Sequence, residues 1–188
     1  MTVSVHINQT QVEDGSVVMK STENLALVRI PAGEGKAFSI AGANLTWKVR
    51  SGEANGDLCL FEQVVEPGEG VPLHTHGYPE AFYVVSGTIH FASSTTSGKS
   101  RDCSAGDVVI ARPHTPHGFF NKGSETVRML SISVAAHERF FDAVEDADEQ
   151  EPFSSQPPAA AFERVIAIGA QTDTHFLPLS SEQSGPEE

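Results

Sequence analysis

The feature of this sequence that most constrains its fold is a histidine-containing segment framed by glycines. His74 and His76 lie on either side of one threonine, and Glu80 follows four residues after His76. Side chains two positions apart in a strand point to the same face, so both imidazoles and, by parity, the carboxylate can point inward. Gly68 precedes this group in a glycine-rich turn, and Gly87 follows its apolar run. The segment therefore predicts a strand that brings two nitrogen donors and one oxygen donor to a single site.

A second segment supplies a further donor. It begins with Gly-Asp at 106–107, passes through the apolar residues 108–110 and reaches His117 and Asn121. Imidazole and carboxylate are ligands for borderline divalent ions, and the segments contain no thiolate, which argues against a structural zinc site. Four protein ligands leave coordination positions open for chemistry. We predict one divalent transition metal (iron, manganese, nickel, cobalt, copper or zinc), held by His74, His76, Glu80 and His117.

The segments GEGVPLHTHGYPEAFYVVSG and GDVVIARPHTPHGFFN resemble the two motifs of the cupin family. The first matches at every fixed position and the second at Gly106, His117 and Asn121. The second departs at Arg112, where the family usually has proline, and at His114, where it usually has glycine. We expect His114 to be a rim side chain and not a fifth ligand. The resemblance implies an all-β fold, a cupin (jelly-roll-like) antiparallel β-barrel, with the metal near its mouth.

The rest of the chain is expected to be arranged around this barrel. The predicted parts are an N-terminal arm that packs on the barrel or on a partner (1–35), the cupin β-barrel with its metal site (36–135), a small C-terminal helical extension (136–179) and a disordered polar tail (180–188).

Short apolar runs within the barrel region predict eight or nine strands. One expected pair is a hairpin of residues 81–85 and 88–92 across Ser86 and Gly87. Apolar residues recur at helical spacing in 135–147 and 159–171. These two stretches therefore predict helices, the second of them packed on the outside of the barrel or over its mouth.

Composition limits the partners. A net charge of −13 argues against nucleic acid and against anionic membrane surfaces, both of which attract Lys and Arg. No apolar run approaches the roughly 20 residues that span a bilayer, and the N-terminus lacks the pattern of a signal peptide. We predict a cytoplasmic protein. The strand at 58–65, apolar on both faces near its start, and the N-terminal arm predict a homodimer.

The C-terminal part narrows the resemblance. HERFFDAV, a proline-rich link, a helix and THFLPL are similar to the C-terminal extension of bacterial single-cupin flavonol dioxygenases, the quercetinases. This implies a mononuclear metal-dependent dioxygenase that opens the heterocyclic ring of a flavonol or similar enolisable aromatic substrate with dioxygen, releasing carbon monoxide. Glu80 would then be both a metal ligand and the catalytic base that takes the proton of the enolic hydroxyl.

Residues for the substrate pocket follow from parity and size. Phe82 shares the parity of Glu80, and large apolar or polar side chains elsewhere complete the set, with core packing as the alternative interpretation. The candidates are Phe82, Phe119, Asn121, Trp47, Phe61 and Met129. Four further histidines lack ligand-like spacing and are expected to lie outside the site: His6, His90, His137 and His175.

Two other functions stay open. The same ligands suit an enzyme that needs no dioxygen, such as an isomerase, cyclase or lyase in which the metal is a Lewis acid. A non-catalytic, ligand-binding cupin is the third possibility, and its sign would be the loss of metal ligands. No ligand is lost here. A fold alone does not decide among these functions.

Overall fold

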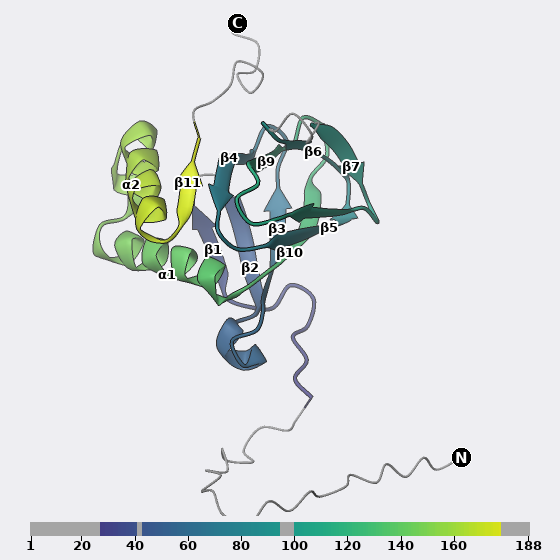
Figure 1. Cartoon of the computed structure of the whole chain (residues 1–188), viewed down its shortest axis with the longest axis horizontal. Coiled ribbons are helices and arrows are strands. Elements are labelled where there is room, and N and C mark those ends of the chain that lie inside the picture. The colour runs from purple at the N-terminus through teal and green to yellow at the C-terminus, as the bar shows by residue number, and fades with distance from the viewer. Residues whose placement is uncertain (1–26, 41–42, 95–99, 178–188) are drawn as a thin grey trace, which may run out of the picture.

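The computed structural model describes residues 27–40, 43–94 and 100–177 of the 188-residue chain (Figure 1). Most of the predicted N-terminal arm and the whole predicted tail at 180–188 lie outside these residues. The elements are β1 (Ala37–Ile40), β2 (Ala43–Val49), η1 (Ser51–Ala54), β3 (Cys59–Val65), β4 (Gly70–His76), β5 (Glu80–Ser86), β6 (Thr88–Ala92), β7 (Arg101–Ser104), β8 (Val108–Ala111), β9 (His117–Phe120), β10 (Val127–Ser133), α1 (Ala135–Gln150), η2 (Phe153–Ser155), α2 (Pro158–Gln171) and β11 (Thr174–Phe176).

The strands form two antiparallel sheets that together make a jelly-roll-like barrel, which confirms the predicted fold class. The larger sheet has the order β1-β2-β3-β10-β5-β8, and the smaller has the order β11-β4-β9-β6-β7. Burial alternates strictly along β3 and β10, as expected when one face of a sheet covers a core. The two helices lie together at one side of the barrel, beside β11 (Figure 1).

The predicted hairpin across Ser86 and Gly87 is wrong. β5 pairs with β10 and β8 in the larger sheet, whereas β6 pairs with β7 and β9 in the smaller one. The chain changes sheet at Gly87, which has a φ of 82° and whose added Cβ would lie 2.9 Å from Val127 Cγ2. Glycine is therefore required by a crossing between sheets and not by a two-residue turn.

The interior contains two packed clusters of buried side chains. One fills the barrel and consists of Val65, Phe82, Val84, Ile89, Phe91, Cys103, Ala111, Phe119, Val127 and Met129. The other joins the barrel to the helices and consists of Leu45, Trp47, Cys59, Phe61, Phe140, Phe141, Val144 and Val165. The apolar stripes that predicted the two helices thus face strands β2 and β3.

Polar contacts fasten α1 to the barrel. Glu138 accepts hydrogen bonds from Arg50 Nε and from the backbone N–H of Ser51, both at 2.6 Å. Arg50 also donates to Asp142 at 2.5 Å, and its guanidinium lies over the Trp47 ring. The start of the helix is therefore held at the end of β2 by a charged hydrogen-bond network.

The strand β11 was not predicted. It pairs antiparallel with β4, with Thr174 opposite His76 and Phe176 opposite His74. The Tyr78 hydroxyl and Thr174 Oγ1, 2.9 Å apart, form a further hydrogen bond between the two segments. The C-terminal segment thus completes the smaller sheet beside the histidine-bearing strand.

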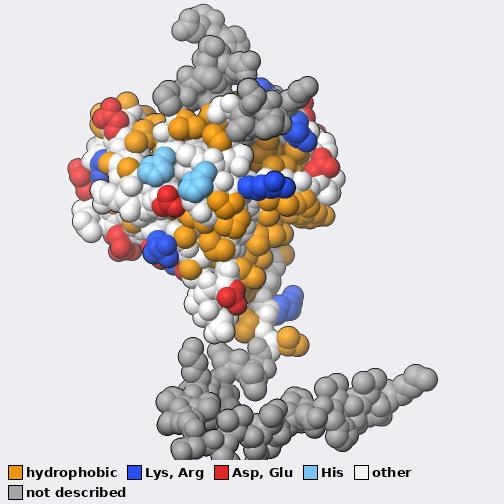
Figure 2. Space-filling view, in the orientation of Figure 1, with side chains coloured by type: hydrophobic (Ala, Val, Ile, Leu, Met, Phe, Trp, Pro, Cys, Tyr) orange, Lys and Arg blue, Asp and Glu red, His pale blue; other side chains and the backbone are white. Residues whose placement is uncertain are grey.

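Large apolar side chains gather on the outer face of the larger sheet, over the region of β5 and β10 (Figure 2). They are Tyr83 and Val85 on β5, Val108 and Ile110 on β8, and Ile132 on β10, between 40% and 65% exposed. β8 is the edge strand of this sheet.

Among the described residues, no helix is long and apolar enough to cross a membrane.

Candidate metal centre and cavity

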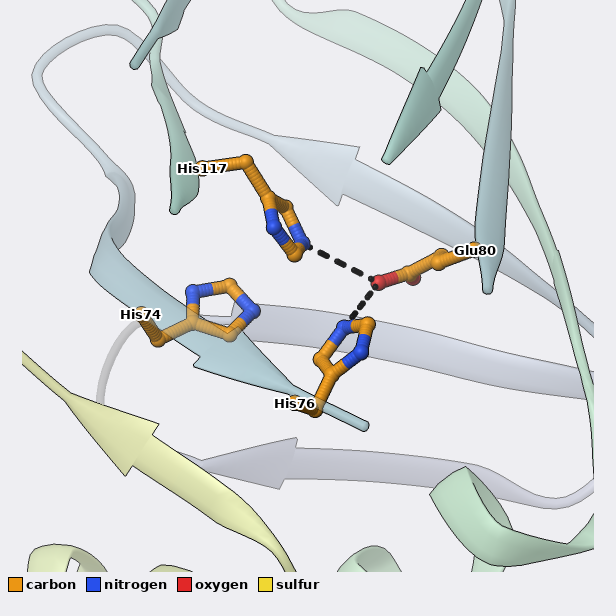
Figure 3. Close-up of side chains that lie close together, drawn as sticks. All are labelled: His74, His76, Glu80 and His117. Carbon is orange, nitrogen blue, oxygen red and sulfur yellow. Dashed lines mark hydrogen bonds and ion pairs between the residues drawn. The ribbon is translucent and has the colours of Figure 1, made fainter. Parts of the chain in front are cut away.

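Four predicted ligands from three strands meet inside the barrel (Figure 3). His74 and His76 end β4, Glu80 begins β5, and His117 begins β9 directly opposite His74. One donor atom from each lies within 4.8 Å of the others, and all four residues are buried. His74 and His76 thus point to the same inward face of β4, as strand alternation predicted.

Each of the three imidazoles is oriented by a backbone carbonyl two residues away. The Nδ1 atoms of His74, His76 and His117 lie 2.9, 2.7 and 2.8 Å from the carbonyl oxygens of Pro72, Tyr78 and Thr115. A carbonyl only accepts, so each Nδ1 carries the proton and each Nε2 keeps its lone pair. Sequence alone did not identify these partners. They fix the tautomer that a metal-binding imidazole needs.

The two oxygens of Glu80 face different neighbours. Oε2 lies 3.4 Å from His76 Nε2 and 3.5 Å from His117 Nε2. Oε1 lies 3.7 Å from Nδ1 of His137, which comes from α1. The carboxylate therefore presents one oxygen to the metal-binding nitrogens and the other to a residue outside the predicted ligand set.

The electrostatics favour neutral imidazoles beside an ionised carboxylate. Burial, together with the nearby His117, lowers the pKa of His74 to about 3, and burial lowers the pKa of His137 to about 4. Burial alone would raise the pKa of Glu80, but His137, His117 and His76 hold it well below its usual range. At neutral pH, His74 is therefore neutral and Glu80 is ionised, which are the states that metal ions bind.

The chemistry of this donor set fits a divalent transition metal. His117 Nε2 is buried without a hydrogen-bond partner among the described residues, as expected for an atom whose partner is an ion. The residues that would hold the metal are His74, His76, Glu80 and His117, and the all-nitrogen-and-oxygen set does not select one ion of the first transition row.

His114 lies outside the group, as expected. Its side chain is exposed, and its backbone has a φ of 62°, the left-handed region that glycine favours. Its N–H donates to the carbonyl of His76 at 2.7 Å. The backbone of His114 thus holds the end of β4, and its positive φ is the conformation that a glycine at this position would adopt without strain.

A cavity of about 770 Å³ reaches the centre, with His74 and Glu80 in its wall. This volume is in the range of pockets that hold small organic ligands. Its walls come from the barrel, from both helices and from β11. Besides His74, the aromatic side chains in the wall are Phe61, Phe82, Phe119, His137, Phe140, Phe141, Phe153, Phe162 and Phe176.

Of the six predicted pocket residues, Phe61, Phe82 and Phe119 line this cavity. Asn121, Trp47 and Met129 do not, and the reasons are structural. The Asn121 amide is fully buried, donates to the carbonyls of Val65 and Glu125, and accepts from the N–H of Gly123. Trp47 packs edge-on against Phe61 and Phe141, and Met129 is fully buried in the barrel cluster.

The residue that sequence reasoning missed is His137. It was expected to lie outside the site, yet it is buried, lines the cavity and faces Glu80. It comes a few residues after the last barrel strand, and its distance in sequence from His74, His76 and His117 matches no ligand pattern. The one available signal was its place on the apolar stripe of α1, between the barrel and Phe140, which indicates burial but not its neighbours.

Comparison with known proteins supports the cupin fold of the barrel. Residues 61–133, from β3 to the end of β10, match the family described as "Cupin domain". The barrel has the cupin fold, and these residues match the cupin domain model. All four predicted ligands lie within the matched residues, whereas α1, α2 and β11 follow them. No curated protein was found that matches the chain.

Solved structures that resemble this cupin share its fold at low identity. The polyketide cyclase RemF from Streptomyces resistomycificus is 21% identical, with a TM-score of 0.52 over 58% of this chain and 80% of RemF. A predicted oxalate decarboxylase from Thermotoga maritima is 22% identical, with a TM-score of 0.50 over 58% of this chain and 98% of its own. A Cupin 2 conserved barrel domain protein from Salinispora arenicola is 22% identical, with a TM-score of 0.50 over 58% and 89%. These similarities support the fold. The resemblance of the C-terminal segment to that of quercetinases stays a prediction.

Proposed function

We propose that this cupin is a metal-dependent dioxygenase of the quercetinase type, acting on a flavonol or a similar enolisable aromatic compound. The observation that carries the proposal is the cavity, because its phenylalanine-rich wall runs up to the carboxylate of Glu80 and to His74. A flat aromatic substrate packs favourably against such rings. Its acidic hydroxyl would lie at the polar end, where a base and a metal site are available.

In this proposal the residues of the site have three roles: holding the metal, accepting the substrate proton and binding the substrate ring. His74, His76, Glu80 and His117 would hold the ion, which when bound supplies activation of dioxygen and of the deprotonated substrate. Glu80 is ionised and takes the hydroxyl proton of the substrate onto a carboxylate oxygen. Phe82 and Phe119, buried beside the centre, hold the substrate ring and exclude water.

A second candidate is a dioxygen-independent isomerase, cyclase or lyase. The observation that favours it is the donor set itself, because three imidazoles and a carboxylate bind redox-inert zinc as well as iron or manganese. Proton abstraction by Glu80 would be common to both functions, so the requirement for dioxygen separates them.

The test is carbon monoxide in the headspace above quercetin and protein that has been reconstituted separately with iron, manganese, cobalt, nickel, copper and zinc. We expect release in air with at least one redox-active ion and none under nitrogen. Glu80→Gln should keep part of its metal and release no carbon monoxide. Glu163→Gln, an exposed position on α2, is the matched control and should release it at the wild-type rate. No release with any ion would reject the flavonol dioxygenase.

We also propose that the protein is a homodimer, but through a different surface from the strand at 58–65 that suggested it. The outward face of β3 is half-buried and offers little apolar surface, whereas the outer face of β5, β8 and β10 carries five exposed apolar side chains. Light scattering of wild type and of Ile110→Lys tests this. We expect a dimer that the lysine dissociates, and a wild-type monomer would refute it. A cytoplasmic location stays a prediction.

A further inference from the structure

His137 occupies an unusual position for a histidine outside the metal-binding group. Its side chain is 5% exposed, and it lies among the rings of Phe61, Tyr78 and Phe141, with ring centroids 4.8–5.6 Å away. Within the described part of the chain, its Nδ1 atom is buried and has no hydrogen-bond partner. Leaving such a buried polar atom unpaired is costly, so the position calls for a partner.

The nearest charged group is Glu80, yet the two side chains do not bond directly. The separation of 3.7 Å between Nδ1 and Oε1 exceeds the length of a hydrogen bond. An oxygen atom placed beside both could lie at about 2.7–2.9 Å from each, the usual length for such bonds. Both residues line the cavity, so a ligand that enters it lies next to this pair.

The two atoms also offer complementary hydrogen bonding. An ionised carboxylate oxygen only accepts, whereas an imidazole N–H donates. A hydroxyl group needs both kinds of partner, because it donates through its hydrogen and accepts through its oxygen. Glu80 is free to use Oε1 in this way because its other oxygen, Oε2, faces His76 and His117.

The geometry points to His137 as a substrate-binding residue: its Nδ1–H and Glu80 Oε1 together hold one acidic hydroxyl of the substrate. The inference rests on the proposed function and deepens it, since it names the group on α1 that receives the reacting oxygen. When the substrate O–H bond breaks, the proton passes to Glu80 and the electron pair stays on the substrate oxygen. That oxygen then carries negative charge, and the bond from His137 strengthens.

This places a functional residue on the helical extension, outside the residues that match the cupin family. The barrel would supply the metal ligands and the base, and α1 would supply the second contact to the substrate oxygen. An enolisable compound with a hydroxyl beside a carbonyl is the class of ligand that this pair would select.

The test uses cobalt-loaded protein, whose visible absorption reports what binds at the metal. Two probes are titrated without dioxygen: maltol, which has an acidic hydroxyl beside a carbonyl, and azide, which binds metal but has no hydroxyl. The variants are His137→Phe, which keeps an aromatic ring, and His137→Asn, whose amide can donate from a position near Nδ1. His175→Phe, an exposed histidine on β11, is the matched control.

We expect His137→Phe to weaken maltol binding about tenfold, the equivalent of 1.4 kcal/mol, and to leave azide binding unchanged. His137→Asn should bind maltol within about threefold of wild type, and His175→Phe should match wild type. Unchanged maltol binding in His137→Phe would overturn the inference. Equal weakening of both probes would also overturn it, because the residue would then act on the metal and not on the hydroxyl.

The carbon monoxide assay separates this inference from the proposed function. If quercetin releases no carbon monoxide but maltol binding depends on His137 as expected, the flavonol reaction is rejected and the hydroxyl-binding pair stands. If carbon monoxide is released but maltol binding is unchanged in His137→Phe, the flavonol reaction stands and the role of His137 with Glu80 in binding the hydroxyl is rejected. Cobalt content and thermal melting of each variant establish that the compared proteins are folded and loaded.

Discussion

Replacing Glu138 with Gln tests how the helical extension is fastened to the barrel. Glu138 accepts from Arg50 Nε and from the N–H of Ser51, both at 2.6 Å, and it follows His137 directly in α1. The amide of glutamine is nearly the same size and keeps one acceptor oxygen, but it removes the negative charge. The substitution therefore isolates the electrostatic part of the contact.

The expected loss follows from the contacts that remain. Hydrogen bonds to a charged group are worth about 1.5–3 kcal/mol each, and one of the two acceptors is lost. Arg50 keeps its bond to Asp142, and its side chain is 31% exposed, so water can replace part of the lost contact. We expect a fall of about 2 kcal/mol in the free energy of unfolding, or roughly 4–8 °C in Tm.

The loss should depend on pH in a defined direction. Burial alone would raise the pKa of Glu138, but the hydrogen bonds from Ser51 and Arg50 lower it below its ordinary value of 4.5. A carboxyl whose pKa is lower in the folded chain stabilises fully above its unfolded value, and that stability is lost as pH falls through the folded value. The difference between wild type and Glu138→Gln should therefore be constant from about pH 7 to pH 5 and shrink below about pH 4.

Urea unfolding of metal-free protein, followed by far-ultraviolet circular dichroism at pH 7, 5 and 3, measures this difference. Glu163→Gln is the matched control and should lie within about 0.5 kcal/mol of wild type. A double-mutant cycle with Arg50→Met should give a coupling of about 1 kcal/mol. A loss below about 0.5 kcal/mol for Glu138→Gln, or a loss that does not shrink in acid, would refute the reasoning.

Three further substitutions test the centre and the barrel. His76→Ala should lose most of its bound metal by elemental analysis while circular dichroism shows an intact barrel, because the β-framework does not need the ion to fold; unfolding of this variant would contradict that. Asn121→Ala removes three hydrogen bonds from a fully buried amide and should cost about 2–4 kcal/mol in urea; a loss below 1 kcal/mol would show that water replaces the amide. Gly87→Ala should cost about 2 kcal/mol, because its φ is 82° and the new Cβ would press on Val127, and an unchanged melting curve would argue against a strained crossing.

The candidate metal-binding group could be predicted from sequence because its geometry is mostly local. His74 and His76 share a strand, and Glu80 begins the next strand after a short connection. Strand alternation then fixes which side chains point inward. His117 needed the family resemblance in addition, since only the pairing of β4 with β9 places it opposite His74.

Strand alternation was not enough to predict the residues that line the pocket. It separates inward-facing from outward-facing side chains but does not say how far along the barrel each one lies. Phe82 and Met129 both point inward, yet Phe82 reaches the cavity and Met129 is buried in the packed cluster. His137 was missed for a related reason. Its contact with Glu80 exists only because α1 folds back across β3, a long-range arrangement that no local pattern records.

The pairing of β11 with β4 also sets an order of events during synthesis. Tyr78 and Thr174, which bond across this junction, are 96 residues apart, so a ribosome needs about 5–20 s to travel between them. Until β11 is made, β4 lacks its outer neighbour in the smaller sheet, and such unpaired edges invite pairing with other chains. β4 also carries His74 and His76, so two of the candidate metal ligands lie on the strand whose outer edge is paired last.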